Sequence, residues 1–384
     1  MKKVIAVAAG LMLTGALVTT ASAAVSFSGD ARIRGYYETD YDFGRTVPVI
    51  EGQVVPRTRT NEEDIKANSR YRVKINADAA GGAYVRSRIK IGDGTQGGVP
   101  NTKTTVTTDY MYVGVPMGPV TIEGGRMPAN VTTWFLWDDR FDMIIGKWAN
   151  DMTGVQFWYR KVVESNNLLS DDDITGYYGL LTQKFAGDWG ITLAGAYIDD
   201  ATIADLSGFT GTIGFGGPAG PVTLMGEFSY KDADLSATSA DDGYGGYLQA
   251  GMDFGATSVS LKGGWAQDGF ASDDDFGFIM LGGASSITPS AVAQFGQFNG
   301  VASDTTFIGG TVGFKASEAL TLTGILAYAQ YDEQGDAFEI SGRARYGISD
   351  GAAIQWDIGY LSWSSDTIEE DSPFGTALTL EVSF

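Results

Sequence analysis

The chain has 384 residues, with 26 lysines and arginines against 47 aspartates and glutamates, and it contains no histidine and no cysteine. The net charge of −21 argues against a nucleic-acid partner, because phosphate backbones attract basic surfaces. Without His and Cys there is no Ser-His-Asp or Cys-His nucleophile, no ordinary zinc site and no disulfide, and we expect no metal or other cofactor. Its 53 glycines and 12% aromatic residues are typical of an all-β chain with many turns.

The first 23 residues have the layout of a secretory signal peptide. Lys2 and Lys3 give a basic start, residues 4–18 are an apolar core, and Ala21-Ser22-Ala23 is a small-residue cleavage signal. The core is shorter than the roughly 20 apolar residues of a membrane-spanning helix. We therefore expect residues 1–23 to be removed and residues 24–384 to form one exported domain, which would cross a membrane with strands.

Apolar and polar residues alternate along most of the remaining chain. In 25–37, for example, Phe27 and Ile33 fall on one face of a strand and Arg32 and Arg34 on the other. The alternating segments have lengths close to the 9–11 residues of a tilted strand that crosses a bilayer. The pattern predicts strands at 25–37, 70–79, 83–91, 107–115, 120–126, 140–148, 153–163, 175–185, 189–199, 209–215, 222–231, 243–254, 257–267, 305–314, 320–331, 337–346, 352–361 and 374–384.

Short turns and long polar connections alternate between these segments. This sorting is typical of outer-membrane barrels, with short periplasmic turns and long extracellular loops, and a β-sandwich has no reason to show it. An aromatic residue ends many strands just before a short turn or at the chain terminus. We expect these residues to form a periplasmic girdle: Phe185, Phe215, Phe254, Phe314, Tyr346 and Phe384.

The strand number depends on one region. Phe254 and Phe314 are 60 residues apart, about twice the usual spacing, and segments 275–282 and 291–298 could be an extra hairpin or a folded loop. The irregular region 120–150 leaves a lower number open. The sequence therefore predicts an up-and-down antiparallel transmembrane β-barrel of about 18 strands, within a range of 16–20.

The face opposite the apolar stripe is charged and hydroxylated. A barrel of about 16–18 strands encloses an aqueous channel, and water there avoids the free-energy cost of burying unpaired charges. We therefore expect a passive diffusion pore, with several acidic runs as solvated loops or, alternatively, as calcium or lipopolysaccharide-bridging sites. The expected pore-lining basic wall comprises Arg32, Arg34, Arg70, Arg72, Lys74, Arg86, Arg88, Lys90, Arg343 and Arg345.

Residues 110–126, which read YMYVGVPMGPVTIEGGR, resemble the strand-turn-strand before the third loop in the general porins of Gram-negative outer membranes. The end of the chain, 378–384, is similar to their closing strand. The resemblance implies a homotrimer in the outer membrane, contact with its lipid and lipopolysaccharide, and recognition of the strand ending in Phe384 by the barrel-assembly machinery. It also implies a constriction, with Arg126 on the basic wall and Asp138, Asp139 and Asp142 as loop acids.

The candidate third loop, 127–139, departs from the family because it is apolar and aromatic and lacks a Pro-Glu-Phe-Gly stretch. Trp134, Phe135 and Trp137 could stack on sugars, contact another protomer or pack within the loop. The leading hypothesis is a general porin for ions and small hydrophilic solutes. The alternatives are a substrate-selective channel, for example for sugars, and a structural or adhesive barrel. Outer-membrane barrel proteases and phospholipases use a catalytic His, so we expect no enzyme.

Overall fold

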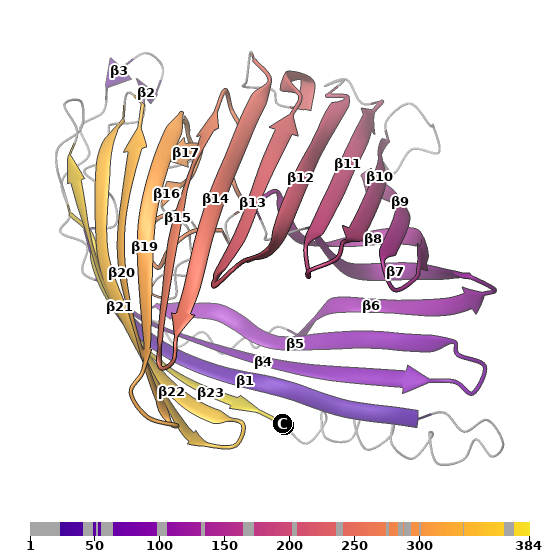
Figure 1. The fold of residues 1–384 in the computed structure, drawn as a ribbon, viewed down its shortest axis with the longest axis horizontal. Helices are drawn as coiled ribbons and strands as arrows, with labels where there is room; N and C mark the ends of the chain where they lie inside the picture. The colour runs from indigo at the N-terminus through magenta and orange to yellow at the C-terminus, as the bar shows by residue number, and fades with distance from the viewer. Residues whose placement is uncertain are drawn as a thin grey trace.

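The computed structural model describes residues 24–40, 49–50, 53–54, 64–97, 106–131, 135–163, 173–201, 206–235, 241–273, 276–282, 287, 293–298, 301–332, 334–364 and 372–384. The predicted signal peptide lies outside these residues. Eighteen strands form one antiparallel sheet, in which each strand pairs with the next along the chain. The last strand pairs with the first, so the sheet closes into a barrel (Figure 1).

The barrel strands have these bounds: β1 Ala24–Thr39, β4 Asp64–Asp78, β5 Tyr84–Gly97, β6 Val106–Met117, β7 Val120–Val131, β8 Trp137–Ala149, β9 Thr153–Val163, β10 Ile174–Lys184, β11 Gly190–Asp200, β12 Gly208–Ala219, β13 Val222–Lys231, β14 Gly243–Phe254, β15 Thr257–Gln267, β19 Thr305–Lys315, β20 Leu320–Tyr331, β21 Gly335–Ser349, β22 Ala352–Ser364 and β23 Phe374–Ser383. All eighteen predicted segments are confirmed. Strands β4, β5 and β7 run several residues further on the long-loop side than predicted.

The extra hairpin left open by the sequence is not part of the barrel. Strands β16 (Ala293–Gln294), β17 (Gln297–Phe298) and β18 (Val301–Ala302) pair only with one another, inside the connection between β15 and β19. The small hairpin of β2 (Val49–Ile50) and β3 (Gln53–Val54) is also separate, and η2 is one short 3₁₀ turn at Ala233–Leu235. The folded-loop interpretation is therefore right, and the barrel has 18 strands.

The outer face of the barrel is apolar and the inner face is mostly polar. Ile33 and Leu378, on adjacent strands, are 50% and 54% exposed, whereas Arg34 and Thr379 beside them point inward. The six predicted girdle residues lie on the outer face at the short-turn ends, from Phe215 at 39% to Phe384 at 68% exposed. Strands with an apolar outer face and a polar inner face are typical of a barrel that is surrounded by lipid and filled with water. No described segment is a helix long and apolar enough to cross a membrane.

A second ring of outward aromatic residues, which was not predicted, lies near the long-loop ends of the strands. Aromatic rings prefer the level of lipid headgroups, so the two rings mark the edges of an apolar band. The second ring comprises Tyr159, Tyr177, Tyr197, Phe209, Phe228, Trp265, Tyr328, Phe338 and Tyr360.

The described residues of the long connection 268–304 fold against the inner face of the barrel. The buried residues of this connection include Phe276, Leu281 and Phe295, and the Phe295 ring stacks on Phe307 of β19 with 3.7 Å between centroids. At Gly359 of β22 an added Cβ would lie 2.4 Å from the sulfur of Met280, so a larger residue there would force the Met280 side chain to move. This connection fills part of the interior beside β19–β22.

Candidate pore lining and constriction

Six neighbouring strands, β21, β22, β23, β1, β4 and β5, bring basic residues far apart in sequence onto one inner wall. The register places Arg32 opposite Arg70, and Lys74 opposite Arg88. Lys66 joins them near the long-loop end of β4 and was not predicted. The wall holds ten of the eleven predicted basic residues: Arg32, Arg34, Arg70, Arg72, Lys74, Arg86, Arg88, Lys90, Arg343 and Arg345.

Carboxylates are interspersed among these cations. Asp30 accepts a hydrogen bond from Arg72 Nε at 2.8 Å and lies 3.9 Å from Arg70. Asp78 pairs with Arg86 at 2.6 Å. These pairs fix the arginine side chains against the wall. Two further pairs are Arg88 with Asp109 and Lys66 with Glu38.

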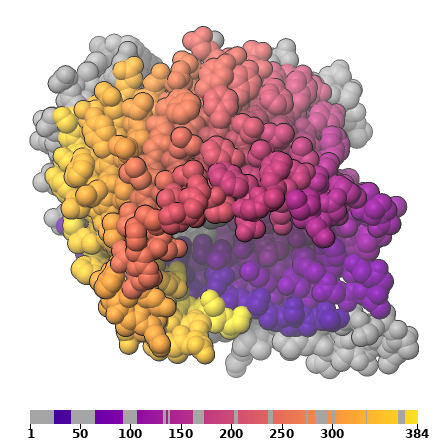
Figure 2. All heavy atoms as spheres, viewed as in Figure 1, coloured from indigo at the N-terminus to yellow at the C-terminus, as the bar shows by residue number. Residues whose placement is uncertain are grey.

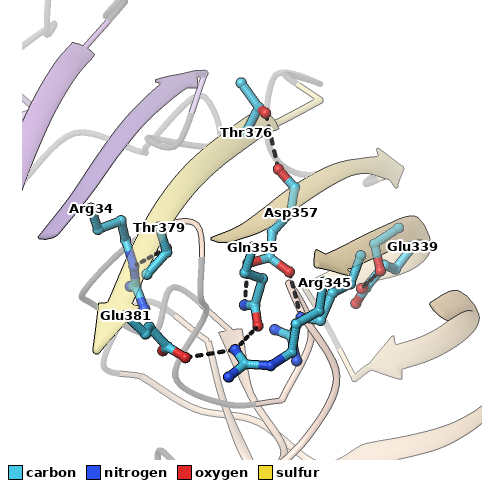
Figure 3. Close-up of polar contacts among 10 residues, drawn as sticks. Arg34, Glu339, Arg345, Gln355, Asp357, Thr376, Thr379 and Glu381 are labelled. Atoms are coloured by element: carbon cyan, nitrogen blue, oxygen red, sulfur yellow. Dashed lines mark hydrogen bonds and ion pairs between the residues drawn. The ribbon is translucent and has the colours of Figure 1, made fainter. Parts of the chain in front are cut away.

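A hydrogen-bonded network lies next to the closure of the barrel (Figure 3). Asp357 is fully buried and accepts from Arg343 Nε at 2.6 Å and from Gln355 Nε2 at 2.7 Å. Arg345 Nη1 donates to Glu381 at 2.6 Å and approaches Gln355 Oε1 at 3.4 Å. The network joins β21, β22 and β23, so the charged groups here are held in fixed positions.

The wall carries more cations than carboxylates. Its described inner face, with the adjacent Asp109 of β6, holds eleven lysines and arginines against seven acids. Arg34 donates to Thr379 Oγ1 at 3.3 Å, and neither Arg34 nor Lys74 forms an ion pair within the described part of the chain. An excess of positive charge follows. The acids are Asp30, Glu38, Asp78, Asp109, Glu339, Asp357 and Glu381.

The facing wall is rich in hydroxyl groups and glycine. Its charged inner-face residues are scattered over several strands and of both signs, for example Glu227, Asp253, Lys184 and Lys262. The space between the walls is hollow in Figure 2, where the indigo-to-purple strands face the magenta-to-orange ones. A one-sided basic wall creates a transverse field across this space. The hydroxyl residues are Thr210, Thr212, Ser229, Ser258, Ser260, Thr311, Thr321 and Thr323.

Arg126 and Asp142 do not line the lumen, and their predicted placement was wrong. Arg126 lies opposite Met111, which is 49% exposed on the outer face, and it forms a 3.2 Å ion pair with Asp142 on that same face. The neighbouring Met127 and Met143 point inward and are buried. The inner face of β7 and β8 becomes apolar here, so alternation leaves the charged pair outside.

The predicted third loop is largely strand. Residues 127–131 belong to β7 and 137–139 to β8. Of the three roles left open for Phe135, solute stacking does not apply, because its ring is fully buried against Phe276 and Tyr247, at 4.7 and 5.3 Å. Asp139 is exposed and accepts a hydrogen bond from the N–H of Arg140. Trp134 and the side chains of Trp137 and Asp138 lie outside the described residues.

Connection 268–304 supplies the inward-folded loop instead. Glu339 on β21 is fully buried and accepts hydrogen bonds from the backbone N–H groups of Met280 and Leu281, at 3.1 and 2.8 Å. Lys262 on β15 donates to the carbonyl of Gly277 at 3.1 Å. One carboxylate and one ammonium group therefore anchor the loop from two sides.

Neither anchor was predicted, because each looks in sequence like any other lumen-facing charge. The available signal was the set Phe276, Phe278 and Met280 in a connection where polar residues are usual. Apolar side chains there need a surface to cover them, and the inner wall provides it. Among the described residues, no group of three or more Asp or Glu side chains could hold a metal ion.

The barrel is similar to solved structures of outer-membrane porins. Pseudomonas aeruginosa OpdQ matches with a TM-score of 0.63 and 9% identity, covering 94% of this chain and 99% of that chain. Pseudomonas aeruginosa OprD gives 0.58 and 12%, covering 94% and 95%, and Acinetobacter baumannii OccAB3 gives 0.56 and 11%, covering 94% and 99%. No family model and no curated protein matches. The chain therefore has a porin-type barrel fold.

Proposed function

We propose that this protein is an outer-membrane porin, a water-filled channel for passive diffusion of ions and small hydrophilic solutes. The observation that carries the proposal is the closed 18-stranded barrel, apolar outside between two aromatic rings and lined inside by an excess of charged groups. Unpaired charges such as Lys74 require water beside them. Barrels of this size leave an aqueous interior.

The one-sided basic wall supports a preference for anions over cations. Mobile anions accumulate beside an excess of fixed positive charge. Phe135 does not support a substrate-selective channel that stacks solutes on the third loop, because its ring is buried.

We further propose that residues 1–23 are a cleaved signal peptide and that the chain resides in a Gram-negative outer membrane as a homotrimer in contact with lipopolysaccharide. The barrel-assembly machinery would recognise the strand that ends in Phe384. The layout of residues 1–23 supports the signal peptide, and the family resemblance of 110–126 and 378–384 supports the other points. The lack of His supports a channel without enzymatic activity.

Planar-bilayer recording of the purified protein tests the channel. We expect stepwise conductance increases, and in a KCl gradient we expect a reversal potential whose sign indicates selectivity for anions. A protein that inserts without any conductance would favour a structural or adhesive barrel. Electrophoresis before and after heating in mild detergent tests the trimer, and a single monomer band in unheated samples would contradict it.

A further inference from the structure

We propose that the inner wall of β4, β5 and β6, close to the short-turn rim, binds phosphorylated sugars in transit. This proposal rests on the channel function above, since the solute must enter the lumen. Two adjacent rows of side chains cross the wall, one cationic and one aromatic and amide-bearing. Together they match a ligand with a phosphate at one end and a hydroxylated ring at the other.

The cationic row contains Ser28, Lys74 and Arg88, which lie opposite one another on β1, β4 and β5. Neighbouring strands are about 4.8 Å apart, so the two cations and the hydroxyl can reach one phosphate. Arg88 is held by Asp109 and lies 4.8 Å from the ring centre of Tyr110. Lys74 forms no hydrogen bond or ion pair with any described residue, so its three donors are open to a phosphate.

The second row lies two residues closer to the short turn, about 7 Å along the strands. It contains Asn76, Arg86 and Tyr112, again in register. Tyr112 is half-buried, with Tyr110 and Tyr84 at centroid distances of 6.1 and 6.5 Å. Its ring offers an apolar surface to the C–H face of a pyranose. The amide of Asn76 can bind the sugar hydroxyls.

The separation of the rows decides the ligand class. The rows are about 7 Å apart along the strands, so one hexose phosphate can place its phosphate in the first row and its ring in the second. Inorganic phosphate reaches only the first row and a neutral sugar only the second. Arg343 and Arg345 at the barrel closure are also bound to carboxylates, but the register places no lysine opposite them. Arg88 has Lys74 opposite it, so the closure offers a poorer site.

Single-channel recording with the full-length protein provides the test. Glucose 6-phosphate, inorganic phosphate and glucose are titrated separately, and we expect glucose 6-phosphate to reduce the KCl current at the lowest concentration. If inorganic phosphate blocks as potently as glucose 6-phosphate, the sugar ring is not recognised and that half of the proposal is wrong. If glucose blocks as potently, the phosphate group is not recognised and the other half is wrong. A channel that conducts KCl but is blocked by none of the three refutes the site and leaves the channel function intact.

Three variants assign the effect to residues. Lys74→Gln should weaken glucose 6-phosphate block about tenfold, the effect of losing one charge-assisted hydrogen bond. Lys184→Gln removes the same charge from the inner face at the short-turn end of β10 and should leave the block unchanged. Tyr112→Leu should weaken block by glucose 6-phosphate and by glucose but not by inorganic phosphate. If Lys74→Gln and Lys184→Gln behave alike, or Tyr112→Leu matches the parent, the site is not where we place it.

Discussion

Glu339 should control how firmly connection 268–304 is held against the pore wall. Glu339→Ala removes the acceptor for the N–H groups of Met280 and Leu281 and leaves both donors buried. A hydrogen bond to a charged acceptor contributes about 1.5–3 kcal/mol, so the two bonds together contribute roughly 3–6 kcal/mol to loop docking. The ratio of docked to undocked loop should fall by about 10² to 10⁴. Glu339→Gln, which keeps one acceptor oxygen, should have a smaller effect.

Single-channel conductance measures this change directly. An undocked loop widens the open cross-section, so Glu339→Ala should conduct more than the parent and admit larger solutes in liposome swelling. Ser341→Ala is the matched control, because that hydroxyl binds Glu339 but not the loop. Heat-modifiable migration verifies that each variant has assembled. Parental conductance and exclusion size in assembled Glu339→Ala would refute the anchoring role.

Three further outcomes follow from the placement of charges. Replacing the wall arginines Arg70, Arg72, Arg86 and Arg88 with Gln should move the reversal potential in a KCl gradient toward the value for cations. An unchanged reversal potential would contradict their lumen-facing position. Arg126→Gln should leave the reversal potential unchanged, because Arg126 and its partner Asp142 lie on the outer face. A shift as large as that of a wall arginine would place it inside. Leu261→Lys, in the middle of β15 on the outer face, should impair assembly at a cost of about 2–4 kcal/mol, whereas Ser260→Lys, on the inner face, should assemble normally as judged by heat-modifiable migration.

The barrel could be predicted from sequence because successive side chains of each strand face lipid and water in turn. A side chain on the lipid face must be apolar, whereas its neighbour in the lumen can be polar. Apolar residues therefore recur at every second position of each strand. Beyond the apolar band this requirement ends. For that reason the long-loop ends of β4 and β5 were not predicted, although their backbones continue the ladder.

The pore lining was less accessible to prediction. Arg126 was placed in the lumen by family resemblance, whereas strict alternation from Ile122, 37% exposed on the outer face, places Arg126 outside. The inward position of connection 268–304 depends on contacts such as Leu281 with Glu339, 58 residues apart in sequence. No local pattern encodes such a contact, since a buried anchoring carboxylate and a hydrated one are the same residue type.

The two ends of the folded chain are joined by backbone hydrogen bonds. The N–H of Gly29 donates to the carbonyl of Phe384 at 2.8 Å, and the N–H of Phe384 donates to the carbonyl of Gly29 at 3.0 Å. These residues are 384 − 29 = 355 positions apart, and contacts of such high sequence separation form slowly. Until they form, β1 and β23 each present an unpaired edge that can recruit other chains. Closure of this seam should therefore be the slow and aggregation-prone step of folding, and deleting Phe384 alone should prolong it.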